Sequence, residues 1–133
     1  ELKKEYGLSY LFVAHDLEVV RHIADRVAVM YAGSILETGT CREVFDDPLH
    51  PYTKALLAAS PKADPAYRGA RQKLTGEVPD PSNLPSGCVF HPRCEFAYDR
   101  CPQEVPPDHR RGSRLVRCHL YEAEDAVSEE VGR

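Results

Sequence analysis

Short apolar runs alternate with turn and capping residues over the first sixty positions. The run from Tyr10 to Ala14 is apolar and stops at His15 and Asp16. Four to eight β-prone residues between turn residues are typical of a strand buried on both faces, so we predict a buried strand over 8–14. A histidine and an aspartate at the carboxyl end of such a strand lie where open α/β sheets place ligand sites.

Helices are predicted on both sides of this strand. The stretch Leu2 to Tyr6 reads as a last helical turn, closed by Gly7. After the strand, Asp16 is a favourable N-cap for a helix that runs to about Asp25. The apolar stripe of that helix would consist of Leu17, Val20, Ile23 and Ala24.

A hairpin and two short helices are expected next. Two β-prone runs, 26–31 and 34–37, are joined by a two-residue loop that contains glycine, which favours a β-hairpin. The residues Thr40 to Glu43 form a capping box, so a helix should begin there and end near Asp47 and Pro48. Another helix is predicted over 51–59, with Leu56 and Leu57 facing inward.

Composition changes after residue 60. Nine of the eleven prolines lie from Pro61 onward, so we expect that the second half is not mostly regular helix or central strand. We expect an extended connection over 61–85 with one strand-like piece at 74–78, and then a cysteine-bearing module over 87–120. The acidic tail from Tyr121 onward has few apolar residues and is predicted to be disordered.

Charge and hydropathy limit the classes of partner. The formal net charge of −4 over 133 residues gives no electrostatic reason to expect nucleic acid or an anionic membrane as a partner. No apolar run approaches the length that spans a bilayer. The first residue is Glu1, in what reads as a helix already under way, so we expect a piece of a longer chain.

Four of the five cysteines are grouped as C-x5-C-x6-C-x16-C, at Cys88, Cys94, Cys101 and Cys118. Four thiols in a segment with little apolar bulk suggest a bound metal in place of a core. Zinc sites prefer closer cysteine pairs, whereas wider spacings and a proline after a ligand occur at iron–sulfur clusters. Zinc, a [4Fe-4S] cluster and two disulfides all stay open on spacing alone. The fifth, Cys41, is predicted to be a small buried residue.

Two motifs carry a family resemblance. The apolar run, His15-Asp16 and the hairpin RVAVMYAGSILETGT at 26–40 resemble the end of the ATPase domain of ABC transporters. The segment HPYTKALL at 50–57 is similar to the oligopeptide and dipeptide importer ATPases within that family. The resemblance implies that His15 is the switch histidine, a catalytic group that contacts the γ-phosphate of ATP. The alternative is a helix-entry histidine that bonds to neighbouring backbone.

The cysteine segment carries the same resemblance. The pattern C-x-F-x-P-R-C at 88–94 is similar to the C-terminal regulatory domain of these ATPases, where it binds [4Fe-4S]. The resemblance therefore implies that the four grouped cysteines are cluster ligands, with zinc as the alternative. Arg93 and Arg117 would then offset cluster charge or be plain surface arginines. The nearby histidines, His91, His109 and His119, are expected at the periphery or the surface, and HPYT is expected to pack and to dock the extension.

The resemblance implies an α+β fold with three parts. Residues 1–48 would end an ABC-type ATPase domain, 49–120 would form the extension with its cysteine module at 87–120, and 121–133 would be the tail. The complete protein would bind ATP and Mg²⁺ with a second ATP-binding subunit and serve transmembrane permeases at the cytoplasmic face of the membrane. This chain has no GxxxxGK[ST] phosphate loop, so we expect it to be inactive alone.

Two further expectations follow. An apolar face left without partners would favour self-association of the isolated chain, through Leu11, Val13, Val27 and Val29. The rival hypothesis is a stand-alone metal-binding module that acts in protein interaction or redox sensing. It would explain the four grouped cysteines, but not the run that ends at His15 or the HPYT segment.

Overall fold

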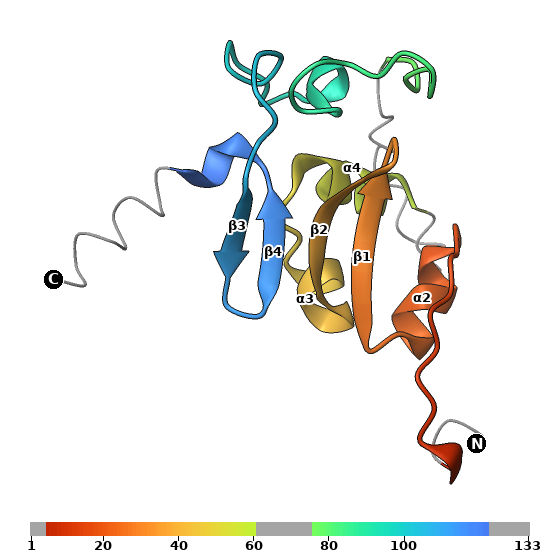
Figure 1. Cartoon of the computed structure of the whole chain (residues 1–133). Helices are drawn as coiled ribbons and strands as arrows, with labels where there is room; N and C mark the ends of the chain where they lie inside the picture. The colour runs from red at the N-terminus through yellow and green to blue at the C-terminus, as the bar shows by residue number, and fades with distance from the viewer. Residues whose placement is uncertain (1–4, 61–75, 123–133) are drawn as a thin grey trace, which may run out of the picture.

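A four-stranded antiparallel sheet is the centre of the fold (Figure 1). The computed structural model of the chain describes residues 5–60 and 76–122. In spatial order the strands are β1 (Arg26–Tyr31), β2 (Ser34–Thr40), β4 (Arg114–Arg117) and β3 (Asp108–Arg111). The α+β fold class is therefore confirmed for the described part of the chain.

The β1–β2 hairpin has the predicted turn. Ala32 and Gly33 have φ angles of 47° and 78°, and positive φ at both central residues is what a type I′ turn requires. β2 is longer than predicted, since its pairing continues until Arg26 lies opposite Thr40. A register shift between Val29 and Met30 interrupts the ladder, and Met30 is exposed while Val29 is buried.

Helices α3 (Cys41–Asp46) and α4 (Pro51–Ala59) follow their local signals. The capping box is present, with the Thr40 amide donating to the Glu43 carboxylate at 2.8 Å and the Glu43 amide donating back to the Thr40 hydroxyl at 3.3 Å. α4 begins at Pro51 and ends at Ala59, as predicted. Leu56 and Leu57 are half-buried. Cys41 is also only half-buried, which corrects the prediction that it is buried.

Helix α2 (Leu17–Ile23) begins where predicted and ends about two residues early. Asp16 caps it, because its carboxylate accepts from the amides of Glu18 and Val19 at 2.9 and 3.2 Å. The Asp25 carbonyl instead accepts the Cys41 amide at 3.0 Å, so Asp25 already belongs to the approach to β1. The predicted apolar stripe is not buried: no residue of α2 is, and Ile23 is 56% exposed.

The predicted buried strand over 8–14 is wrong for this structure. No strand is assigned there, and Leu11 and Val13 are 98% and 99% exposed. A strand buried on both faces needs hydrogen-bonded neighbours, and no other described segment pairs with 8–14. Of the helical turn expected before it, Glu5 and Tyr6 are helical, Gly7 has the left-handed φ of 62°, and residues 1–4 lie outside the described part.

Two short strands come from the second half of the chain, and one of them lies inside the sheet. β4 lies between β2 and β3, with Glu37 opposite Val116 and Thr38 opposite Leu115. The segment 108–117 contains no proline, so its amides are free to pair. The predicted strand-like piece at 74–78 is not a strand over 76–78, and its first two residues fall within 61–75, outside the described residues.

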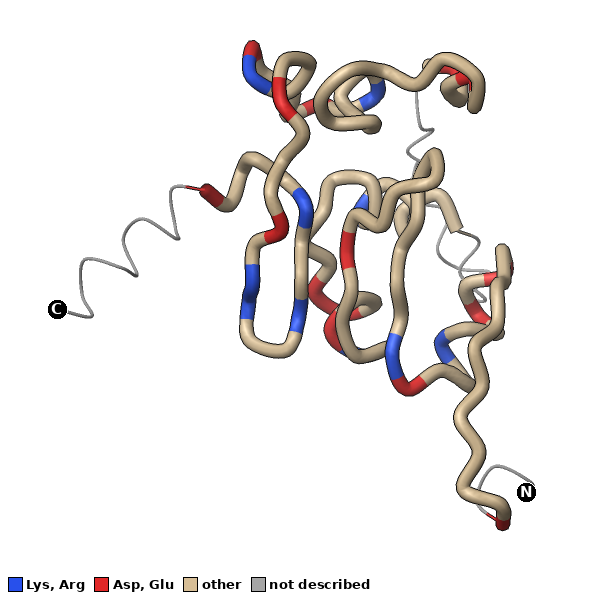
Figure 2. Tube along the Cα trace, in the orientation of Figure 1, with Lys and Arg blue, Asp and Glu red and all other residues tan. Residues whose placement is uncertain are grey.

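The start of the predicted tail is ordered. Tyr121 ends the 3-10 helix η2 (His119–Tyr121), and its hydroxyl donates to the Leu49 carbonyl at 2.8 Å. Residues 123–133 lie outside the described part. Basic positions run along β3 and β4 in Figure 2, and Arg114 of β4 contacts Asp47 at 3.1 Å.

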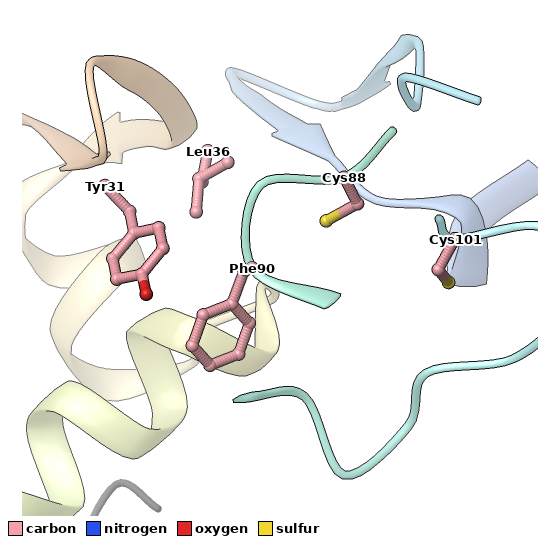
Figure 3. Packing of buried hydrophobic residues seen from close by; sticks show 5 residues of the cluster. All are labelled: Tyr31, Leu36, Cys88, Phe90 and Cys101. Atoms are coloured by element: carbon pink, nitrogen blue, oxygen red, sulfur yellow. The ribbon is translucent and has the colours of Figure 1, made fainter. Parts of the chain in front are cut away.

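The buried core lies where the hairpin meets the cysteine segment. Phe90 is 1% exposed and contacts the rings of Tyr31 and Tyr52, each at a centroid distance of 5.3 Å. Figure 3 shows Phe90 beside Tyr31 and Leu36, with Cys88 and Cys101 in the same cluster. The cysteine segment therefore packs directly on the β1–β2 hairpin.

Candidate functional site

The four grouped cysteines line one small cavity. They come from four different places: Cys88 from a turn, Cys94 from the end of the 3-10 helix η1 (His91–Arg93), Cys101 from a second turn, and Cys118 from the residue before η2. Cysteines up to 30 positions apart in sequence therefore line the same cavity. The other lining residues include His50, Pro51, Phe90, His91 and His119.

Backbone hydrogen bonds hold the turns that carry Cys88 and Cys101. The Cys88 amide donates to the Cys101 carbonyl at 2.8 Å, and the Cys101 amide donates to the Tyr98 carbonyl at 2.9 Å. Gly87 allows the first of these contacts, because it has a φ of 68° and a Cβ there would lie 2.3 Å from the Cys101 carbonyl oxygen. The close approach of the two turns therefore depends on this glycine.

Burial disfavours the thiolate forms of these cysteines. It raises the pKa of Cys118 to about 11, and the charges of the other three cysteines add to the effect. Burial also raises the pKa of Cys88 and Cys94, again with contributions from neighbouring cysteines. Since coordinating thiols are deprotonated by a bound metal, a cationic group in the cavity would reverse this preference. All five cysteines of the chain are free thiols in the structure, not disulfides.

The four cysteines line one cavity, but the described side chains are not arranged as a metal site. Among the described residues, no group of three or more His, Cys, Asp or Glu side chains is arranged to hold one metal ion. A cubic cluster binds each thiolate through its own iron, so its ligands need not converge on one point.

His50 forms one wall of the cavity and begins α4. Its Nδ1 accepts a 3.0 Å hydrogen bond from the Tyr52 amide, and its side chain is 1% exposed. Burial lowers the pKa of His50 to about 4. Its own amide donates to the Glu37 carboxylate at 2.9 Å, and the Leu49 amide donates to the other carboxylate oxygen at 2.8 Å. Glu37 thus fixes the start of α4 to β2.

The sequence gives no signal that His50 lines the cavity or that Glu37 fixes the start of α4. The HPYT segment predicts packing, and packing is present, but the Nε2 atom of His50 is buried without a hydrogen-bond partner among the described residues. Glu37 is a charged residue that follows two apolar residues in β2, yet it is 1% exposed. Only the long-range pairing of β2 with β4 and the return of the chain at Leu49 bury it.

The two arginines and three histidines near the cysteines have local partners. The Arg117 guanidinium binds the Asp108 carboxylate at 2.8 and 3.1 Å, and Arg93 donates to the Tyr31 hydroxyl at 3.3 Å. His109 and His119 are buried, contrary to a surface position. His119 is held at both nitrogens, by Glu122 at 2.6 Å and by the Glu104 carbonyl at 2.9 Å.

His15 does not line the cysteine cavity. It is exposed, at the end of the extended segment and directly before the Asp16 cap of α2. The cap fixes the backbone that follows the histidine, which leaves the imidazole at the surface. The His15 imidazole is therefore accessible from the surface of the described part of the chain.

Comparison with known proteins places the chain in a family. The sequence profile described as oligopeptide/dipeptide transporter, C-terminal region matches residues 36–101. The dipeptide transport ATP-binding protein DppF of Haemophilus influenzae is 50% identical over 89% of this chain and 36% of that protein. DppF of Escherichia coli is 46% identical over 94% of the chain and 37% of that protein. The oligopeptide transport ATP-binding protein AppF of Bacillus subtilis is 48% identical over 91% and 38%.

The relatives are named as ATP-binding proteins of dipeptide and oligopeptide transport. The chain belongs to the oligopeptide and dipeptide branch of that family and corresponds to its C-terminal part. It spans about a third of the length of the curated relatives it matches. Among the described residues, no helix combines the length and the apolar character that crossing a bilayer demands.

Proposed function

We propose that the complete protein is the ATP-binding subunit of a peptide-importing ABC transporter. It would bind ATP and Mg²⁺ together with a second ATP-binding subunit and drive transmembrane permeases from the cytoplasmic face of the membrane. The supporting observation is the match to named peptide-transport ATP-binding proteins over 89–94% of the chain. A stand-alone metal-binding module does not account for a match that includes the first half.

His15 is the residue of this chain that we assign to ATP hydrolysis. An imidazole N–H aimed at the γ-phosphate stabilises the charge that shifts in phosphoryl transfer to water. Its exposure and its place before the Asp16 cap support this role, since the cap fixes the loop while the ring stays accessible. The phosphate loop and the Mg²⁺ ligands would come from other parts of the complete protein.

The test is ATP hydrolysis by the complete transporter with His15→Ala. Loss of a group that donates to the transferred phosphate should lower kcat by roughly 10²-fold or more while ATP still binds. His22→Ala is the matched control, because His22 is an exposed histidine on α2 that bonds only to the Glu18 carbonyl of its own helix. An unchanged kcat for His15→Ala would contradict the assignment.

We also propose that Cys88, Cys94, Cys101 and Cys118 hold a [4Fe-4S] cluster, with zinc as the alternative. The shared cavity and the free thiols support the proposal. The cluster would supply a fixed crosslink among four loops that have few apolar residues of their own, and we assign it a structural or regulatory role. Broad visible absorption and a paramagnetic signal after reduction are expected from the complete protein, whereas zinc gives neither.

The exposed segment 8–14 fits the assignment of the complete protein as an ATP-binding subunit. In the complete protein we propose that it pairs with strands of the ATPase domain, which would cover Leu11 and Val13. In the isolated chain these side chains are 98% and 99% exposed. A second copy of the chain would then cover them, so self-association is expected only when the rest of the domain is missing.

A further inference from the structure

We propose that the loop 95–100 and Leu120 form a docking surface for a partner polypeptide whose apolar side chains are flanked by Lys or Arg. Every residue of this loop is exposed, and the loop carries two aromatic side chains, Phe96 at 49% exposure and Tyr98 at 45%. Leu120, on η2, is 43% exposed. The inference goes beyond the proposed function and does not depend on a metal in the cysteine cavity.

The three apolar side chains form one surface, which we call the aromatic patch. Phe96 and Leu120 line the same cavity, together with His119. The ring of Tyr98 contacts the His119 ring edge-on, at a centroid distance of 6.4 Å. Single exposed apolar side chains are ordinary, whereas a contiguous group of them marks an interaction site, and aromatic residues are enriched at such sites.

Carboxylates surround the aromatic patch. Glu95 and Asp99 are exposed neighbours of the two aromatic residues in the loop. Glu104 and Glu122 lie beside the loop, because Arg100 contacts the carboxylates of both, that of Glu104 at 2.8 Å. One guanidinium is therefore shared between two carboxylates, and the loop adds two further negative charges.

This charge selects the kind of partner. Arg93, the arginine that precedes the loop, donates to the Tyr31 hydroxyl at 3.3 Å and is directed at the hairpin instead. A second copy of the chain would bring the same carboxylates face to face, and an anionic lipid surface would be repelled as well. A polypeptide with Lys or Arg beside its apolar residues is complementary to the patch in charge.

The aromatic patch is separate from the exposed segment 8–14. In Figure 1 the teal segment that leads into β3 lies beyond the end of the strands, whereas the red segment that contains 8–14 extends past their opposite end. Contacts that cover 8–14 in the complete protein therefore do not by themselves cover the aromatic patch.

The test measures binding of a probe to the complete protein by fluorescence anisotropy. The probe is a labelled synthetic helix of leucine and lysine with leucine along one face, and a leucine–glutamate helix of the same pattern is its control. Wild type should bind the lysine probe at least about tenfold more tightly than the glutamate probe. Added salt should weaken this binding, because the carboxylates are exposed.

The combined variant Phe96→Ser and Tyr98→Ser should weaken binding of the lysine probe by about tenfold or more, since aromatic anchors dominate the affinity of interfaces. Val78→Ser is the matched control, because Val78 is 74% exposed and lies outside the patch. Equal binding by wild type and the double variant, or equal binding of the two probes to wild type, would overturn the inference.

Hydrogen exchange on the wild type covers the case in which the double variant fails to fold. The amides of 95–100 should exchange more slowly when the lysine probe is bound, and protection confined to other segments would contradict the proposal. Binding to vesicles of phosphatidylcholine and phosphatidylserine that the double variant loses would assign the patch to a membrane instead. A wild-type dimer that the double variant does not form would assign it to a second copy, and either result overturns a separate polypeptide partner.

Discussion

The carboxylate of Glu37 on β2 accepts a 2.9 Å hydrogen bond from the backbone amide of His50, the residue that caps α4. Its other oxygen accepts from the Leu49 amide at 2.8 Å, and the side chain is 1% exposed. This buried contact sets the position of the HPYT segment, and with it one wall of the cysteine cavity, relative to the sheet.

Glu37→Gln should destabilise the fold, because one acceptor oxygen is replaced by an amide group that faces a backbone donor. Hydrogen bonds to a charged or buried acceptor of this kind contribute about 1.5–3 kcal/mol, so we expect the free energy of unfolding to fall by about that amount. Urea denaturation measures it. Glu18→Gln, at an exposed position on α2, should change it by less than about 0.5 kcal/mol. Equal free energies of unfolding for the two variants would contradict a stabilising role of the Glu37 contact.

Gly87→Ala should open the cysteine cavity. The new Cβ would lie 2.3 Å from the Cys101 carbonyl oxygen, so the two turns that carry Cys88 and Cys101 must separate. We expect faster reaction of the cysteine thiols with a thiol reagent in the metal-free protein, and loss of bound metal in the loaded one.

Gly112→Ala is the matched control for this prediction. Gly112 also has a positive φ, of 61°, but nothing lies within 4 Å of an added Cβ. The cost there is the left-handed backbone alone, about 1–2 kcal/mol, without any change in thiol reactivity. If both variants react alike, the close approach at Gly87 has no special role in the cavity.

Glu43 should contribute stability that acid removes. Hydrogen bonds from the Ser113 hydroxyl and from the amide and hydroxyl of Thr40 lower the pKa of Glu43 from 4.5 to about 2. A carboxyl with a lower pKa in the folded state stabilises the fold above about pH 4.5, and that contribution disappears as the pH falls towards 2. The stability difference between wild type and Glu43→Gln should therefore shrink over that range in urea titrations.

The hydrogen bond from Ser113 in the β3–β4 turn, at 2.6 Å, joins the second half of the chain to α3. A difference between wild type and Glu43→Gln that does not depend on pH would mean that the carboxylate is not stabilised by these donors.

The exposed segment 8–14 should make the isolated chain self-associate. Leu11→Ser combined with Val13→Ser removes two almost fully exposed apolar side chains and should shift the chain towards monomer in sedimentation experiments. Val78→Ser is the control, because Val78 is 74% exposed but lies outside this segment. Unchanged association in the double variant would exclude the segment as the contact surface.

Local signals in the sequence predict the elements whose partners lie within a few residues. The Thr40–Glu43 capping box, the Ala32-Gly33 turn and the bounds of α4 are of this kind, and the structure confirms them. The match to the peptide-transporter family, inferred from the apolar run and HPYT, is confirmed as well.

The sequence does not predict features that depend on contacts with distant residues. The run over 8–14 has strand composition, but whether it forms a strand is decided by neighbours that the described residues do not supply. The placement of β4 beside β2 depends on pairing across more than seventy residues, and that pairing also buries Glu37. A count of prolines over the whole second half hides the proline-free segment 108–117 that forms the inner strand.

The most direct test of the account is the metal and sulfide content of the complete protein, purified without oxygen, for wild type, Cys94→Ser and Cys41→Ser. Cys41 is the matched control, because its sulfur lies 3.5 Å from the Arg21 carbonyl and does not line the cavity. We predict about four iron and about four sulfide per chain for wild type and Cys41→Ser, and loss of both in Cys94→Ser. Stoichiometric zinc without sulfide, or no bound metal, would contradict the cluster.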